Sequence, residues 1–195
     1  MTDSPKKSKT TYKVGKTKQI IAVGGEWDAF AEENEGRKAL SRSVIGRPIW
    51  DFITGAPTRM WLETLFQLAE LRNEPVERIY RCDSPQLKRV MSMRISPEED
   101  RVLRVDNELL SVEPLEKKVV IRHHSHQTGT DIRMRCSICG KIKEKENEVW
   151  TEPADLVDQI PEGIVVAYTV CAACKQALPR AGARKPWQHR EPPDL

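Results

Sequence analysis

Four cysteines near the end of the chain constrain its fold more than any other feature. They form two Cys-x-x-Cys pairs, Cys136 with Cys139 and Cys171 with Cys174, separated by 31 residues. Each pair can turn its two sulfur atoms toward one ion, and two pairs complete the tetrahedral thiolate shell that Zn²⁺ favours. Because sulfur fills all four positions, such an ion has no open position for water or substrate. The spacing therefore predicts a structural zinc site.

Cysteines in this spacing also occur in iron sites, disulfides and redox-active sites. Iron in a rubredoxin-like site uses the same four thiolates, so ligand type alone does not distinguish the two metals. Disulfides require an oxidising compartment, and the lysine-rich start of the chain lacks the apolar segment of a secretion signal. A thioredoxin-like site uses one such pair rather than two. Release of zinc on thiol oxidation would make the cluster a redox sensor.

The length, composition and charge of the chain restrict the class of protein that it can be. The chain has 195 residues, of which 31% are charged and 38% hydrophobic, so we expect one domain of ordinary size with a small satellite module. No apolar run approaches the roughly 20 residues of a membrane-spanning helix, so no membrane partner is expected. The five cysteines, four of them in metal spacing, fit a reducing cytoplasm. A net charge of +3 is too small to require a nucleic-acid partner.

The first hundred residues alternate in pattern between strand and helix. Apolar periodicity predicts a strand at 19–23, a helix at 26–33, short helical turns at 44–53 and a longer helix at 57–71. Three strands follow at 76–82, 87–95 and 102–110, joined by short polar turns that imply an antiparallel meander. Helices set on one face of an antiparallel sheet make an α+β domain. In the cysteine segment we expect strands at 132–135 and 164–170, and helices at 152–160 and 172–178.

Three phrases in this first region resemble PAS-like sensor domains of bacterial signalling proteins. They are EWDAFA at 26–31, VIGRPIWD at 44–51 and YRCDSP at 80–85. The resemblance implies a five-stranded sheet cupping a helical side, used for ligand sensing or for protein association. The cysteine segment, which starts Cys-x-x-Cys-Gly-Lys-Ile-Lys, looks like a zinc-ribbon or treble-clef-like module of the kind found beside such sensory domains.

These patterns divide the chain into five parts. We expect a disordered basic tail at 1–17, a PAS-like domain at 18–112, a linker at 113–131, a four-cysteine zinc module at 132–179 and a disordered tail at 180–195. Five large apolar side chains are candidates to line a ligand pocket in the PAS-like domain: Trp27, Trp50, Trp61, Phe66 and Met91. Aromatic side chains at helical spacing are more often plain core than pocket lining.

Together these features favour a non-enzymatic, cytoplasmic regulatory or sensory protein. Phosphate-binding glycine loops, kinase ATP-site motifs and nucleophile elbows are missing from the sequence. The PAS-like domain would sense a small ligand of unknown identity or associate with a protein partner or a second copy, and the zinc module would present a surface to a partner. The alternatives are a nucleic-acid-binding regulator that uses the zinc module and basic tails, and a thiol redox sensor at the zinc site.

Overall fold

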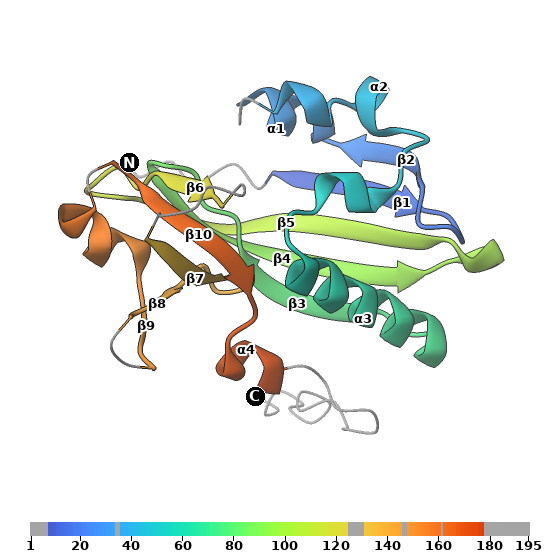
Figure 1. Cartoon of the computed structure of the whole chain (residues 1–195). Coiled ribbons are helices and arrows are strands. Elements are labelled where there is room, and N and C mark those ends of the chain that lie inside the picture. The colour runs from blue at the N-terminus through green and yellow to red at the C-terminus, as the bar shows by residue number, and fades with distance from the viewer. Residues whose placement is uncertain (1–7, 34–35, 125–130, 146–147, 161, 178–195) are drawn as a thin grey trace, which may run out of the picture.

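The fold combines helices with two sheets. The computed structural model describes residues 8–33, 36–124, 131–145, 148–160 and 162–177 (Figure 1). The first sheet has five strands, all paired antiparallel in the order β2-β1-β5-β4-β3. Its strands are β1 (Lys9–Val14), β2 (Ile20–Gly25), β3 (Val76–Arg81), β4 (Leu87–Pro97) and β5 (Leu103–Pro114). The chain is therefore an α+β protein with an antiparallel sheet.

The segment between β2 and β3 is helical and covers one face of this sheet. It contains α1 (Trp27–Glu33), η1 (Arg37–Ala39), α2 (Ser41–Val44), η2 (Ile49–Phe52) and α3 (Ala56–Arg72). In Figure 1, α2 lies beside β2, and α3 lies beside β3 and β4. Helix α3 follows Gly55, has a proline in its first turn and ends at Asn73 in the left-handed conformation.

The main core lies between α3 and the first sheet. One face of α3 is buried, including Leu65 and Phe66, and it packs against strand residues such as Ile95 and Val105. In β4 the alternate residues from Arg89 to Ile95 are buried, as expected for a strand with one face on the core. The predicted helices and strands of this region are confirmed, with boundaries that shift by up to a few residues.

The second sheet is mixed and contains the cysteine segment. Its order is β6-β10-β7-β8-β9, with β10 parallel to both β6 and β7 and the other pairs antiparallel. The strands are β6 (Ile121–His123), β7 (Ile132–Cys136), β8 (Ile142–Lys143), β9 (Trp150–Thr151) and β10 (Ile164–Thr169). Between β9 and β10 the predicted helix is a 3-10 helix, η4 (Pro153–Gln159), and α4 (Ala172–Gln176) follows β10.

Two parts of the expected division differ in the structure. Residues 9–14 were assigned to a disordered tail but form β1, the strand that joins β2 to the centre of the first sheet. Buried Thr10, Tyr12 and Val14 alternate with Lys9, Thr11 and Lys13, so the segment has the period-two pattern of a strand despite its lysines. The linker expected at 113–131 contains β6, whose parallel pairing with β10 is a long-range contact. Residues 1–7 of the first expected tail and the whole of the second, 180–195, lie outside the described residues, as do 178–179 of the expected zinc module.

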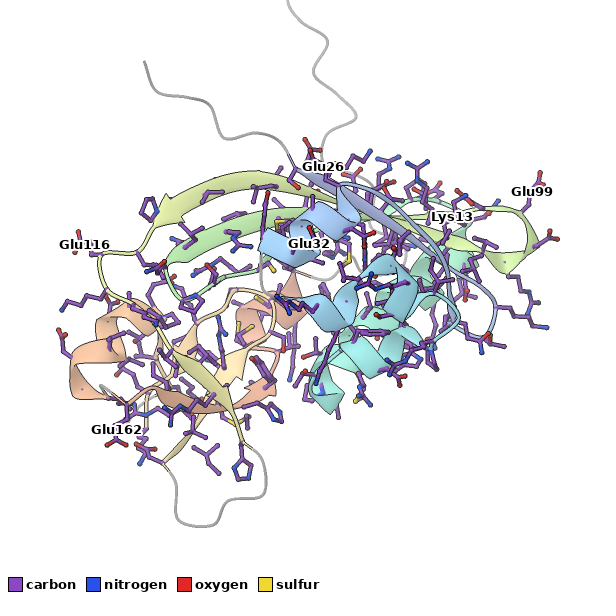
Figure 2. The ribbon with its side chains drawn as sticks, turned by 90° about the horizontal axis from the view of Figure 1, so that it is seen from above. Lys13, Glu26, Glu32, Glu99, Glu116 and Glu162 are labelled. Carbon is purple, nitrogen blue, oxygen red and sulfur yellow. The ribbon has the colours of Figure 1, made fainter. Side chains whose placement is uncertain are left out.

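The two sheets share a core rather than standing apart. Cys136, Ile138, Val170 and Cys171 belong to the same buried apolar cluster as the α3 residue Leu65. Seen from above, Glu116 and Glu162 lie at the end of the molecule that carries the second sheet, while Lys13 and Glu99 lie at the opposite end (Figure 2). The cysteines therefore lie where the second sheet meets the helical layer of the first.

Candidate metal centre and the adjoining cavity

The structure brings all four predicted cysteines together. Their Sγ atoms lie within 4.8 Å of one another, and the Sγ atoms of Cys139 and Cys171 are 3.9 Å apart. Four sulfurs at a Zn–S distance of about 2.3 Å around one ion would be about 3.8 Å apart at the edges of the tetrahedron. All five cysteines of the chain are free thiols. The cluster therefore has the composition and the spacing to hold a metal ion such as zinc.

Parallel strand pairing explains how two distant cysteine pairs meet. Strands β7 and β10 run side by side in the same direction, and Thr169 is in register with Cys136. Both strands therefore end at the same edge of the second sheet, where each continues directly into its Cys-x-x-Cys turn. Cys136 is the last residue of β7, and Cys171 is the residue that precedes α4.

The first cysteine turn is closed by backbone hydrogen bonds. The amide of Gly140 donates to the carbonyl of Cys136 (3.0 Å), and the amide of Cys136 donates to the carbonyl of Lys141 (2.8 Å). Gly140 has φ of +73°, and a Cβ atom there would lie 3.2 Å from Asp83 Oδ2. Both the left-handed backbone and the close approach of the carboxylate favour glycine at this position.

Backbone amides point at the most buried sulfur. The amides of Cys171 and Ile138 lie 3.4 and 3.5 Å from Cys136 Sγ. A hydrogen bond from the Cys139 thiol, together with these amides, lowers the pKa of Cys136 to about 4. The same thiol hydrogen bond, with burial, raises the pKa of Cys139 far above its usual value. Burial, followed by a hydrogen bond with Cys171, raises the pKa of Cys174 to about 12. Without a cation the cluster therefore keeps Cys139 and Cys174 protonated, and a divalent ion would favour their thiolates.

A half-buried ion network joins the cysteine turn to the meander of the first sheet. Arg81 makes a bidentate pair with Asp83, with both N–O distances 2.8 Å, and its Nη1 lies 2.9 Å from Glu152 Oε2. Arg135 Nη2 lies 3.3 Å from the same Asp83 carboxylate. Burial alone would lower the pKa of Arg81, but its hydrogen bonds to Asp83 and Glu152 raise it. Arg81 Nη1 also donates to the carbonyl of Cys139 (3.3 Å), so this network holds the cysteine turn.

An apolar cavity of about 450 Å³ lies between the helices and the first sheet, beside the cysteine turn. Volumes of this size are typical of small-molecule sites. Of the five residues predicted for a ligand pocket, Trp27, Trp61 and Met91 line this cavity. Trp50 and Phe66 are not among the described residues that line it. Their rings pack together in the core, with centroids 6.0 Å apart.

Several residues that line the cavity were not found by sequence reasoning. Tyr80 on β3 donates a hydrogen bond from its hydroxyl to Asn107 Oδ1 on β5 (3.0 Å), and both side chains line the cavity. Ser137 and Ile138, the two residues between the first cysteines, also line it. The alternation of β5 was a usable signal for Asn107, since it shares a face with Leu103 and Val105. The sequence does not predict that the cysteine turn lies beside the cavity, because this position depends on contacts between the two sheets.

The chain matches no protein-family model, no curated protein and no solved structure. Within the described residues, no helix has both the length and the apolar character needed to cross a membrane.

Proposed function

We propose that this chain is a non-enzymatic, cytoplasmic regulatory protein, in which a PAS-like domain senses a small ligand or associates with a protein. The single observation that carries this proposal is the five-stranded antiparallel sheet with its helical layer on one face and an apolar cavity between them. This arrangement agrees with what the resemblance of residues 26–31, 44–51 and 80–85 implies. The cavity, rather than any constellation of catalytic groups, is the part of this domain suited to a ligand.

The four cysteines hold a structural zinc ion in a zinc-ribbon-like or treble-clef-like module. The donor set supports zinc because four thiolates fill its tetrahedral shell and leave no position for a substrate. The burial of Cys136 and Cys171 in the shared core supports a structural role, since loss of the ion would disturb packing between the sheets. Iron uses the same ligands, and its visible absorption would distinguish it from zinc, which is colourless.

The test compares the mass of the purified full chain under native and denaturing conditions. The proposal predicts a native mass that includes the metal and either a small organic molecule lost on denaturation or a second copy of the chain. A bound organic molecule would support ligand sensing, and a dimer with an empty cavity would support association. Both roles of the PAS-like domain would be contradicted by a metal-loaded monomer whose cavity holds no organic molecule and which has no protein partner in the cytoplasm of its source cells.

Thiol redox sensing is the second candidate, and one distance favours it. The Sγ atoms of Cys139 and Cys171 are 3.9 Å apart, so a small movement would bring them to bonding distance once the metal leaves. Peroxide treatment followed by metal analysis tests this function, because a redox sensor would release its ion and a purely structural site would retain it.

Nucleic-acid binding has less support from the described residues. Three lysines of the lysine-rich start of the chain form ion pairs with carboxylates: Lys9 with Asp106, Lys13 with Glu98 and Lys18 with Glu70. Most of the basic residues of the two tails lie outside the described residues. Binding of DNA or RNA that weakens steeply with salt would favour this function.

A further inference from the structure

We propose that the metal centre and the apolar cavity form one coupled unit: the cavity binds an uncharged, mainly apolar molecule, and its affinity depends on a metal ion at the four cysteines. This inference rests on the proposed zinc site and specifies how that site regulates ligand binding. It arises from one juxtaposition. The two residues enclosed by the first cysteine pair, Ser137 and Ile138, are also part of the cavity wall.

The position of this wall is fixed by the cysteine turn itself. Ile138 is buried, and its amide is directed at Cys136 Sγ, 3.5 Å away. A turn that carries two metal ligands with only two residues between them has little conformational freedom once both sulfurs are bound. Release of the ion removes this restraint, and the turn is then held by packing and by its hydrogen bonds to neighbouring elements.

Three further contacts tie the same turn to the elements around the cavity. The hydroxyls of Ser137 and Thr58, the latter in the first turn of α3, share a hydrogen bond of 2.5 Å. The amide of Ser137 donates to the carbonyl of Thr169 (2.8 Å) after β10. The amide of Arg81 donates to the carbonyl of Ile138 (2.8 Å), and this bond prolongs the hydrogen bonding of β3. A change at the metal therefore reaches the helical and the sheet sides of the cavity through direct contacts.

The lining indicates the class of ligand. Aromatic and aliphatic side chains dominate it, and the charge of Arg81, the cation in the lining, is compensated by Asp83 and Glu152. An ionised ligand would therefore lose its hydration without gaining a counter-ion. Tyr12, a buried residue of the lining, carries a hydroxyl. That hydroxyl suits one polar atom of an otherwise apolar molecule.

Coupling between two binding sites is reciprocal. If the metal-bound turn improves the cavity for a ligand, then the ligand, by packing on Ile138, must strengthen metal binding by the same factor. Coupling between sites in proteins is commonly about fivefold to 150-fold. Direct contact through a single turn predicts an effect of about tenfold or more.

The test uses N-phenyl-α-naphthylamine, an uncharged dye whose fluorescence rises in apolar surroundings, and the full chain with a known metal content. We expect the dye to bind the zinc-loaded protein at one site, and to bind the chelator-treated protein at least about tenfold more weakly. The sulfonated analogue of the dye carries a fixed negative charge on a similar ring system and should also bind at least about tenfold more weakly. Equal affinity of the dye for the loaded and the metal-free protein would overturn the proposal.

Metal removal can unfold part of the chain, so the reciprocal measurement decides the question in the loaded protein. Competition with a coloured chelator should show zinc held about tenfold more tightly when the dye is saturating. An unchanged zinc affinity with the dye bound would refute the coupling while leaving the structural zinc site intact. A chain that binds no metal at all would instead refute the proposed function.

A matched pair of variants locates the coupling in the first cysteine turn. Ile138→Ala and Ala173→Ser both alter the third residue of a cysteine pair, but Ile138 lines the cavity whereas Ala173 is exposed on α4. Ile138→Ala should keep its zinc and lose most of the effect of the dye on zinc affinity. Ala173→Ser should retain that effect. Equal coupling in both variants would contradict the role of Ile138.

Discussion

The backbone amide of Arg81, the last residue of β3, donates a 2.8 Å hydrogen bond to the carbonyl of Ile138, between the first two cysteines. The edge strand of the first sheet thus pairs with the cysteine turn of the second. The Arg81 side chain strengthens the same junction, since its guanidinium reaches the carbonyl of Cys139. This junction makes the first cysteine turn a part of the core between α3 and the first sheet.

Removal of Asp83, the central carboxylate of the half-buried ion network, should destabilise the protein. Asp83→Ala removes the carboxylate that Arg81 and Arg135 share and leaves only Glu152 to compensate Arg81, so we expect a loss of about 3 kcal/mol in the free energy of unfolding. The control is Asp51→Ala, which breaks an exposed pair with Arg47 and should cost about 1 kcal/mol or less. Urea unfolding measures both. Equal small losses would show that the network contributes little.

The hydrogen bond between Thr58 and Ser137 should contribute to the junction as a pair. Thr58→Val and Ser137→Ala each remove one of the two hydroxyls, and each leaves its partner without this bond. A double-mutant cycle in urea unfolding should give a coupling energy of about 1 kcal/mol. Losses that simply add would indicate that α3 and the cysteine turn are held by other contacts.

Position 140 should require glycine for two reasons, its positive φ and the close approach of the Asp83 carboxylate. Gly46 also has a positive φ, but a Cβ there would meet nothing within 4 Å, whereas at Gly140 it would lie 3.2 Å from Asp83 Oδ2. Gly46→Ala should therefore cost about 1–2 kcal/mol from backbone strain alone. Gly140→Ala should cost more and should also weaken zinc binding in a chelator competition. A Gly140→Ala protein with unchanged zinc affinity would contradict this prediction.

Asp106 should contribute stability that depends on pH. Burial would raise its pKa, but hydrogen bonds from Thr11 and Arg104 outweigh burial and lower the pKa below its ordinary value of 3.8. A carboxylate with a lowered pKa in the folded state stabilises the protein above about pH 4, and this stabilisation is lost as the pH falls through the folded pKa. Asp106→Asn should therefore be less stable than the natural protein at neutral pH, and the difference should shrink in acid.

Urea midpoints of the two proteins, compared at each pH, measure this difference, because any loss of metal in acid is common to both. Thr11→Val removes one donor to Asp106, at 2.7 Å, and should produce a smaller change of the same sign. A difference that grows as the pH falls would mean that the pKa of Asp106 is raised instead.

Sequence patterns were informative where local chemistry determines structure. The alternation at 87–95 predicted β4, because one face of a strand must be buried. The two cysteine pairs predicted their own convergence, because a thiolate site needs four ligands in one place. The segment that forms β1 was predicted to be a disordered tail because of its lysines, Lys9 and Lys13. The alternation of buried Tyr12 and Val14 was nevertheless a signal for a strand.

Long-range contacts were not predictable in the same way. The strand β6 has only three residues and exists through parallel pairing with β10. The second role of Ile138, as part of the cavity wall, depends on the approach of β3 to the cysteine turn. Trp50 and Phe66 were grouped with Trp61 as pocket candidates because spacing identifies a buried helix face, and it does not separate the core from the cavity wall.

The most direct test of the account is the metal content of the full chain, purified without chelator and measured together with its native mass. A zinc site made by the four cysteines predicts one zinc ion per chain, four thiols protected from alkylation while the ion is bound, and loss of the ion in Cys174→Ser. A metal-free protein whose four cysteines react freely, or whose mass shows disulfides between them, would contradict the account.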